Sequence, residues 1–222
     1  MAELNSAYIE KMEDVLAVYE KPYDPDEPVV CLDEKLVSLH ADVRPPSPAQ
    51  PGQPAKQDNE HKRCGTANRF GVVEPRTGRH LTEATANRKG AEFARQVNHI
   101  VRQYGNARTI HLVMDNLNTH CRKSLVDSFG EEKGGRIWDR LTVHYTPKHG
   151  SWLNQAEIEL SIVSRQCLGR RRIGELAALQ RETAAWKRQA NRQRRTIKWR
   201  FTRRKARQVF RYRKPPRRRG GP

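Results

Sequence analysis

The stretch Val113-Met-Asp-Asn-Leu-Asn-Thr-His120, followed by His144-Tyr-Thr-Pro-Lys-His-Gly-Ser-Trp-Leu-Asn-Gln-Ala-Glu157, decides how this chain is interpreted. It places Asp115 at the end of an apolar run and Glu157 near the start of a predicted helix. A third acid, Asp33, lies in the apolar run Pro28-Val-Val-Cys-Leu-Asp-Glu34. Three carboxylates held at the tips of rigid elements are what a site needs to hold hard divalent cations against a phosphodiester.

Simpler explanations exist for each of these acids. Asp33 could be a strand residue whose carboxylate is satisfied by backbone groups, and Asp115 could be a helix cap or turn aspartate. Glu34 should point away from Asp33, because side chains alternate along a strand, so it is the weaker candidate. Glu157 and Glu159 lie two positions apart on a helix, about 200° around it, so both cannot face one metal site.

Apolar periodicity and turn residues predict an α/β protein. The predicted elements are a helix over residues 3–20, strands over 29–40, 66–74 and 79–86, a helix over 90–104, a strand over 109–114, a helix within 120–138 that breaks near Gly130 or Gly134, a strand over 141–145, and helices over 153–168 and 175–193. Ser151 is a plausible cap for the helix that carries Glu157. This order favours a mixed sheet with helices on its faces.

Bulk composition narrows the class of protein. The chain has 222 residues with 36% hydrophobic content and a mean hydropathy of −0.92. No apolar run approaches the roughly 20 residues that span a bilayer, and the N-terminus does not resemble a signal peptide, so we expect a cytoplasmic protein. Its four cysteines are scattered, which favours reduced thiols over disulfides or a zinc site.

The charge of +18 is unevenly distributed along the chain. Residues 1–159 carry 21 Lys and Arg against 23 Asp and Glu, a net charge of −2, whereas residues 160–222 carry 22 against 2, a net charge of +20. Such asymmetry indicates a polyanionic partner, most plausibly nucleic acid. The alternative is a solvated basic tail without a specific partner.

Several motifs together resemble the catalytic core of bacterial insertion-sequence transposases of the mariner-like superfamily, which are DDE endonucleases. The matching stretches are Met12-Glu-Asp-Val-Leu, Pro22-Tyr-Asp-Pro, Val29-Val-Cys-Leu-Asp-Glu-Lys35, Gly65-Thr-Ala-Asn68, Asp115-Asn-Leu-Asn-Thr-His120, Tyr145-Thr-Pro-Lys-His-Gly-Ser-Trp-Leu-Asn-Gln155 and Trp199-Arg-Phe-Thr202. Their order and spacing from about Met12 to about Tyr212 carry the resemblance. It implies a ribonuclease-H-like fold with Asp33, Asp115 and Glu157 as catalytic metal ligands.

The resemblance also implies the reaction and its partners. Two Mg²⁺ or Mn²⁺ ions would support phosphodiester hydrolysis at the ends of a mobile element and then strand transfer to target DNA. Synapsis of two element ends would suggest a homodimer acting on the bacterial nucleoid. The residues predicted to bind DNA are Lys148, His149, Arg170, Arg171, Arg172, Arg203, Arg204 and Lys205. His120 could contact DNA, tune the site or be structural, and Trp199 and Phe201 are expected to pack back on the core.

Three segments are expected: a leading helix and linker over residues 1–27, the catalytic domain over 28–193, and a basic extension over 194–222. The helix-turn-helix region that precedes the catalytic core in the family has no counterpart here, so the chain could be a truncated copy or a separately encoded part. Two other functions therefore stay open. One is a catalytically silent DNA-binding remnant, and the other is a nuclease of the same fold acting on hybrid or branched nucleic acid.

Overall fold

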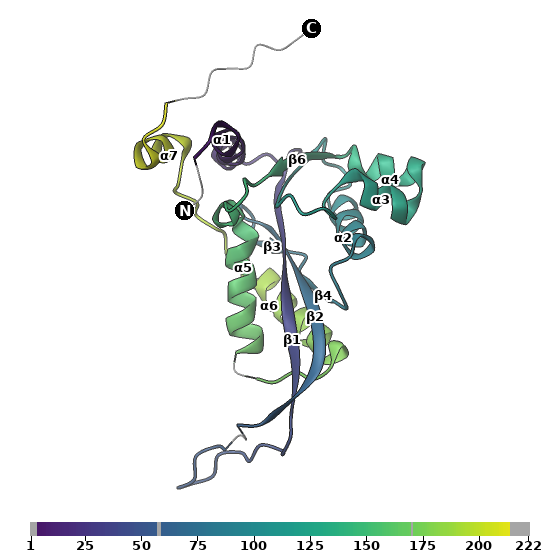
Figure 1. Cartoon of the computed structure of the whole chain (residues 1–222), viewed down its shortest axis with the longest axis vertical. Coiled ribbons are helices and arrows are strands. Elements are labelled where there is room, and N and C mark those ends of the chain that lie inside the picture. The colour runs from purple at the N-terminus through teal and green to yellow at the C-terminus, as the bar shows by residue number, and fades with distance from the viewer. Residues whose placement is uncertain (1–3, 57–58, 170, 214–222) are drawn as a thin grey trace.

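The structure is a computed structural model that describes residues 4–56, 59–169 and 171–213 (Figure 1). The strands are β1 (Val29–Asp42), β2 (His61–Glu74), β3 (Arg79–His80), β4 (Glu83–Thr85), β5 (Ile110–Met114) and β6 (Leu141–Tyr145). The helices are α1 (Ser6–Glu20), α2 (Gly90–Gln103), α3 (Arg122–Phe129), α4 (Glu131–Trp138), α5 (Gln155–Val163), α6 (Leu176–Gln193) and α7 (Arg203–Phe210). None of the helices in these ranges is both long and apolar enough to cross a membrane.

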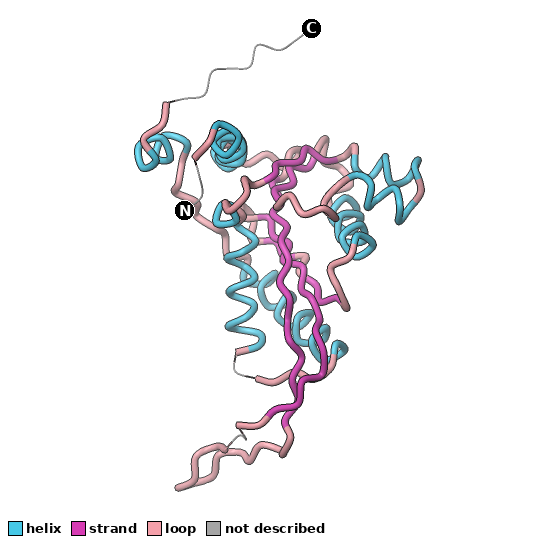
Figure 2. Tube along the Cα trace, in the orientation of Figure 1, coloured by secondary structure: helices cyan, strands magenta, loops and turns pink. Residues whose placement is uncertain are grey.

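The strands form one mixed sheet in the order β3-β2-β1-β5-β6, with β4 paired to β2. Strand β1 is antiparallel to β2 along most of its length and parallel to β5, which is in turn parallel to β6. Figure 2 shows β1 and β2 as two long strands running side by side well beyond the short parallel pair. The predicted architecture, a mixed sheet flanked by helices, is confirmed.

Each face of the sheet buries its own hydrophobic core. The even-numbered residues of β1, such as Val30 and Leu32, pack against Phe93 and Val97 of α2. The odd-numbered Cys31 faces the opposite layer, which contains α1, the start of α5 and the segment that follows α6. In Figure 1 α2, α3 and α4 therefore lie on one side of β1, and α1, α5 and α7 lie on the other. This alternation assigns the residues near the start of β1, Asp33 and Glu34 among them, to opposite layers.

Most predicted strands are confirmed, but two boundaries were wrong. Strand β2 begins at His61 rather than residue 66, because Arg63 and His61 continue the antiparallel pairing with β1 past a bulge at Leu39/His40. The predicted strand over residues 79–86 is two short strands, β3 and β4. Both pair with β2, and they are separated at Leu81 and Thr82, where the Leu81 N–H and the Thr82 hydroxyl form hydrogen bonds with the Val72 backbone.

The helix predicted within residues 120–138 does break at Gly130, whose φ of 83° lies in the region that favours glycine. The helix that carries Glu157 starts later than predicted. Ser151 is not its cap, because Ser151–Leu153 form a separate 3₁₀ turn, and the side chain of Asn154 instead accepts the Ala156 N–H at 3.1 Å. Past Val163 the helix widens into a π turn, Ser164–Leu168.

The basic C-terminal extension folds back onto the domain as far as residue 213. Trp199 and Phe201 pack on the core layer that contains α1, as predicted. Helix α7 lies against α1, where the Arg207 guanidinium donates two hydrogen bonds of 2.6 Å to Glu13 and Arg203 pairs with Glu20 at 2.8 Å. Two of the basic residues of this extension are therefore already neutralised within the fold.

Candidate metal centre

Two of the predicted acids are placed by the pairing of adjacent parallel strands. Cys31 of β1 pairs with Val113 of β5. Asp33 and Asp115 each follow two residues later, so they occupy equivalent positions on the same face of the sheet. Because Val113 and Cys31 both face the α5 layer, both aspartates lie at the edge of that layer. This is the carboxyl end of β5, where ligands gather in α/β sheets.

Helix α5 carries the third acid, and two features bring it close to β1. Gly71, which pairs with Asp33, has no side chain, and a Cβ there would lie 2.6 Å from Leu160 Cγ. At the helix start, the Asn154 side chain donates a 2.7 Å hydrogen bond to the Leu32 carbonyl. Glu157 lies one turn before Leu160 and one turn after Asn154, so both contacts hold Glu157 near Asp33.

The electrostatics of Asp33 reflects the proximity of the other acids. Burial is the largest influence that raises the pKa of Asp33 to about 7, and the charges of Glu34, Asp115 and Glu157 act in the same direction, against one lowering hydrogen bond from the Glu34 N–H. Like charges that crowd one site favour the protonated acid in this way. Asp115 and Glu157 therefore lie near enough to Asp33 for their charges to act on its carboxyl group.

The carboxylate of Asp115 has a cationic partner that the other two acids lack. Burial raises the pKa of Asp115, but the hydrogen bond and charge of His120 outweigh it and hold that pKa below its usual value. His120 Nδ1 lies 2.7 Å from Asp115 Oδ1, and His120 Nε2 lies 3.3 Å from Glu34 Oε2. Burial lowers the pKa of His120, whereas Asp115 and Glu34 outweigh burial and raise it to about 9.

Glu159, the alternative to Glu157, lies elsewhere. It is 4% exposed, its carboxylate is 3.4 Å from His80 Nδ1 on β3, and burial raises its pKa to about 7. It therefore faces the layer between α5 and α6 rather than the aspartates. Glu157, the acid that the family motif favours over Glu159, is the α5 residue whose charge acts on Asp33.

The donor atoms fit a hard divalent cation. All three predicted ligands are carboxylates, the ligand type that Mg²⁺ prefers. Burial first, and then the charges of Glu34, Asp115 and Glu157, raise the pKa of Asp33, and a bound cation would offset both effects. Among the described residues, the side chains whose ligand atoms all lie within 4.8 Å of one another are those of Glu34, Asp115 and His120, so this cluster shares only Asp115 with the three predicted ligands. Glu34 and Asn154 are the site residues that sequence reasoning missed. Strand alternation argued against Glu34, and only a capping pattern at Asn154 could have indicated its role.

Some of the residues predicted to bind DNA are exposed, and others already form ion pairs with acids of the fold. Lys148 and His149 are exposed on the loop before α5, where His149 adopts a φ of 63°. Arg171 pairs with Glu182 and Arg172 with Asp42, both at 2.8 Å, so these two arginines join parts of the fold. Arg203 pairs with Glu20, whereas Arg204 and Lys205 are exposed on α7. Arg170 lies outside the described residues.

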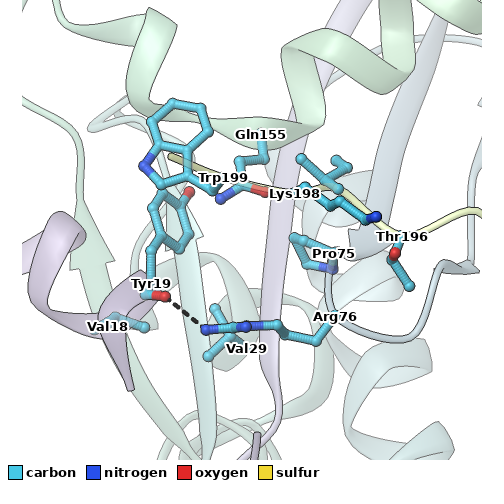
Figure 3. A pocket seen from close by; sticks show the side chains of 10 residues that line it. Val18, Tyr19, Val29, Pro75, Arg76, Gln155, Thr196, Lys198 and Trp199 are labelled. Atoms are coloured by element: carbon cyan, nitrogen blue, oxygen red, sulfur yellow. Dashed lines mark hydrogen bonds between the residues drawn. The ribbon is translucent and has the colours of Figure 1, made fainter. Parts of the chain in front are cut away.

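A pocket of about 290 Å³ lies away from the acids, where the segment after α6 crosses the β2–β3 turn (Figure 3). Ile197 N–H donates to the Pro75 carbonyl, and Arg76 donates 2.9 Å hydrogen bonds to the carbonyls of Tyr19 and Lys21. Aromatic, aliphatic and basic side chains line this pocket. The residues that line it include no Asp or Glu, so it offers no carboxylate to a metal.

The mixed sheet in the order β3-β2-β1-β5-β6, with helices on both faces, is a ribonuclease-H-like fold. The model of the DDE superfamily endonucleases matches residues 28–180. The chain belongs to this family. A search of curated proteins by sequence gave no match.

Solved structures of the mariner transposase Mos1 share the fold. The paired-end complex with Mn matches with a TM-score of 0.54 at 16% identity, over 86% of this chain and 59% of that one. The Mos1 strand transfer complex gives 0.54 at 17% identity, over 83% and 55%. The paired-end complex with Mg gives 0.51 at 16% identity, over 83% and 56%. This chain thus spans less than two thirds of the length of those transposases.

Proposed function

We propose that this chain is the catalytic domain of a metal-dependent DNA transposase. The observation that supports the proposal is that Asp33 and Asp115 each follow a paired position of two parallel strands by two residues, while the charge of Glu157, on the covering helix, acts on Asp33. Family membership supports an endonuclease. The solved Mos1 complexes are paired-end and strand transfer complexes, which supports the ends of a mobile element and its target DNA as substrates. Two such ends would be held by a homodimer.

The three acids would hold one or two Mg²⁺ or Mn²⁺ ions. Divalent ions bound there would polarise the scissile phosphate and lower the pKa of an attacking water. Asp115 is kept ionised by His120, so it is ready to act as a ligand near neutral pH. Asp33, whose pKa burial raises to about 7, would bind the metal in its ionised form. Lys148 and His149 are exposed on the loop before α5, where they can contact DNA phosphates.

The proposed reaction has two steps at one site. A phosphodiester at the element end is hydrolysed first, which frees a 3′-hydroxyl. That hydroxyl then attacks a phosphodiester of the target DNA. A new phosphodiester bond forms, and the 3′-oxygen of the target strand is displaced. The alternative that the chain only binds DNA is favoured by one observation, the net charge of +20 on residues 160–222, because such a surplus binds DNA whether or not the acids work.

Nicking of supercoiled plasmid with Mg²⁺ or Mn²⁺ tests the proposal. We expect Asp33→Asn, Asp115→Asn and Glu157→Gln each to slow nicking by at least about 100-fold, since losing a metal removes several kcal/mol of transition-state stabilisation. Glu159→Gln is the matched control, an acid of the same helix that should leave nicking unchanged. DNA binding without nicking by the wild-type chain, with either metal, would contradict the proposal and leave a DNA-binding protein.

A further inference from the structure

Glu34 reaches the metal centre from the opposite side of its strand. It follows Asp33, so its side chain lies on the α2 face of β1, and that side chain is only 2% exposed. Its Oε2 lies 3.3 Å from His120 Nε2, while His120 Nδ1 lies 2.7 Å from Asp115 Oδ1. His120 therefore bridges two carboxylates that come from opposite faces of the sheet.

The bridging ring is held in place by its surroundings. His120 is 1% exposed and stacks on Phe93 with ring centroids 4.5 Å apart and an interplanar angle of 25°. The Tyr145 hydroxyl donates a 2.8 Å hydrogen bond to the His120 carbonyl. The stacking on Phe93 restricts the tilt of the ring, and the Tyr145 hydrogen bond holds the backbone that carries it.

Glu34 is poorly compensated for a buried acid. Its Oε2 makes no well-aligned hydrogen bond, and beyond His120 its ionic partner is Arg88, whose Nη1 is 3.8 Å away and whose side chain is 48% exposed. Burying a carboxylate with so few partners destabilises a fold. Groups of this kind cluster where function requires them.

We propose that Glu34 is a positioning residue which, through His120, fixes the carboxylate of Asp115 in the orientation that holds a metal ion. This inference rests on the proposed function. Asp115 follows the last residue of β5 and its side chain is 42% exposed, so packing alone does not hold its carboxylate. Partners behind the ligands orient metal sites in this way, and their loss typically costs 10–100-fold in metal affinity.

The test is Mn²⁺ binding to the purified chain, measured by calorimetry without DNA. We expect Glu34→Ala to weaken binding about 10-fold or more. Glu34→Gln should retain most of the affinity, because its side-chain oxygen occupies the same position beside His120. The double variant Glu34→Ala/His120→Ala should bind Mn²⁺ no more weakly than His120→Ala alone. Glu34 acts on Asp115 only through His120, so its loss has no further effect once His120 is gone. Glu159→Gln, a buried acid away from the site, is the control.

Each other outcome overturns the inference. Wild-type affinity in Glu34→Ala would show that Asp115 needs no such support. Equal loss in Glu34→Gln and Glu34→Ala would show that charge rather than orientation matters, and additive losses would show that Glu34 does not act through His120. If Glu34→Ala fails to fold, Glu34→Asp, which draws the carboxylate back from His120, replaces it. Absence of Mn²⁺ binding by the wild-type chain would instead overturn the proposed function, and this inference with it.

Discussion

Asp33 in β1 and Asp115 just after β5 each follow a paired residue of the two strands by two positions, yet their pKa values move in opposite directions. Both are partly buried, and burial is the largest influence on each. The difference is the partner: Asp115 has His120 at 2.7 Å, whereas Asp33 has the charges of three acids. Without metal, one acid of the pair is therefore ionised and stabilising, and the other is a carboxyl that resists ionisation.

This asymmetry predicts opposite effects of two matched substitutions in metal-free protein. An aspartate in an unfolded chain has a pKa of about 3.9, whereas Asp33 has one of about 7 when folded. The folded state thus keeps a proton that the unfolded state has lost, so Asp33 reduces stability progressively as pH rises from about 4 to 7. In EDTA at pH 8, Asp33→Asn should raise the thermal unfolding midpoint, and the gain should shrink towards pH 5.

Asp115→Asn should change the thermal unfolding midpoint in the opposite direction in the same experiment. Its pKa is lowered in the fold, so ionised Asp115 stabilises the protein above about pH 4, and its replacement should lower the midpoint at pH 8. Added Mg²⁺ should raise the midpoint of the wild-type chain and not that of Asp33→Asn. A drop in midpoint for Asp33→Asn at every pH would show that its carboxylate is stabilised rather than crowded.

Single residues also mark how far the sequence predicts the site. Asp33, Asp115 and Glu157 could be chosen because each lies at the end of an apolar run or in a family motif. Glu34 could not, because alternation correctly predicts its face but not that His120, 86 positions later, reaches back to it. Contacts between residues so distant depend on the packing of α2 and the loop after β5, which local patterns do not determine.

At the scale of elements, the position of α5 depends on a missing side chain. The pairing partner of Asp33 is Gly71, and an added Cβ would lie 2.6 Å from Leu160 Cγ and 2.9 Å from Cδ2. Leu160 is 3% exposed and packed, so either the helix or the leucine must move. Gly71 thus sets the distance between α5 and the sheet, and with it the distance between Glu157 and the aspartates.

Gly71→Ala should therefore lower the free energy of unfolding by about 1–3 kcal/mol, the usual cost of overpacking a core. Urea unfolding measures this change. Gly105→Ala is the control, because the atom nearest to its added Cβ is 3.8 Å away. The double variant Gly71→Ala/Leu160→Ala should lose less stability than the sum of the two single losses, since the two side chains compete for one space. Equal stability of Gly71→Ala and wild type would show that α5 adjusts freely.

Elements were predicted well where periodicity is strong and poorly where tertiary contacts decide. Helix α2 and strand β5 follow from apolar patterns alone. Helix α7 did not, because its sequence is mostly basic and only Ala206 is fully buried. What orders it is the docking of Arg203 and Arg207 on acids of α1, which lie more than 180 positions earlier in the chain.

For the whole molecule, the basic residues near the C-terminus fall into two groups: some form ion pairs within the fold, and others are exposed to solvent. Residues 160–222 carry 22 Lys and Arg, but the fold already uses several of them. On α7, Arg203 and Arg207 are bonded to Glu20 and Glu13, while Arg204 and Lys205 are exposed on the same helix. Of these four cations, the exposed pair can release counterions from DNA without first breaking an internal ion pair.

Two double variants of equal net charge separate these roles. Arg204→Ala/Lys205→Ala should reduce the slope of log affinity against log salt by up to about 1.8, roughly 0.9 for each DNA phosphate that the variant no longer neutralises. Arg203→Ala/Arg207→Ala removes the same charge but should leave that slope nearly unchanged and instead lower the thermal unfolding midpoint, because α7 loses its anchors on α1. Binding of a short duplex measured between about 50 and 200 mM salt decides between them. Equal slopes for both variants would mean that overall charge, not the exposed face of α7, governs DNA binding.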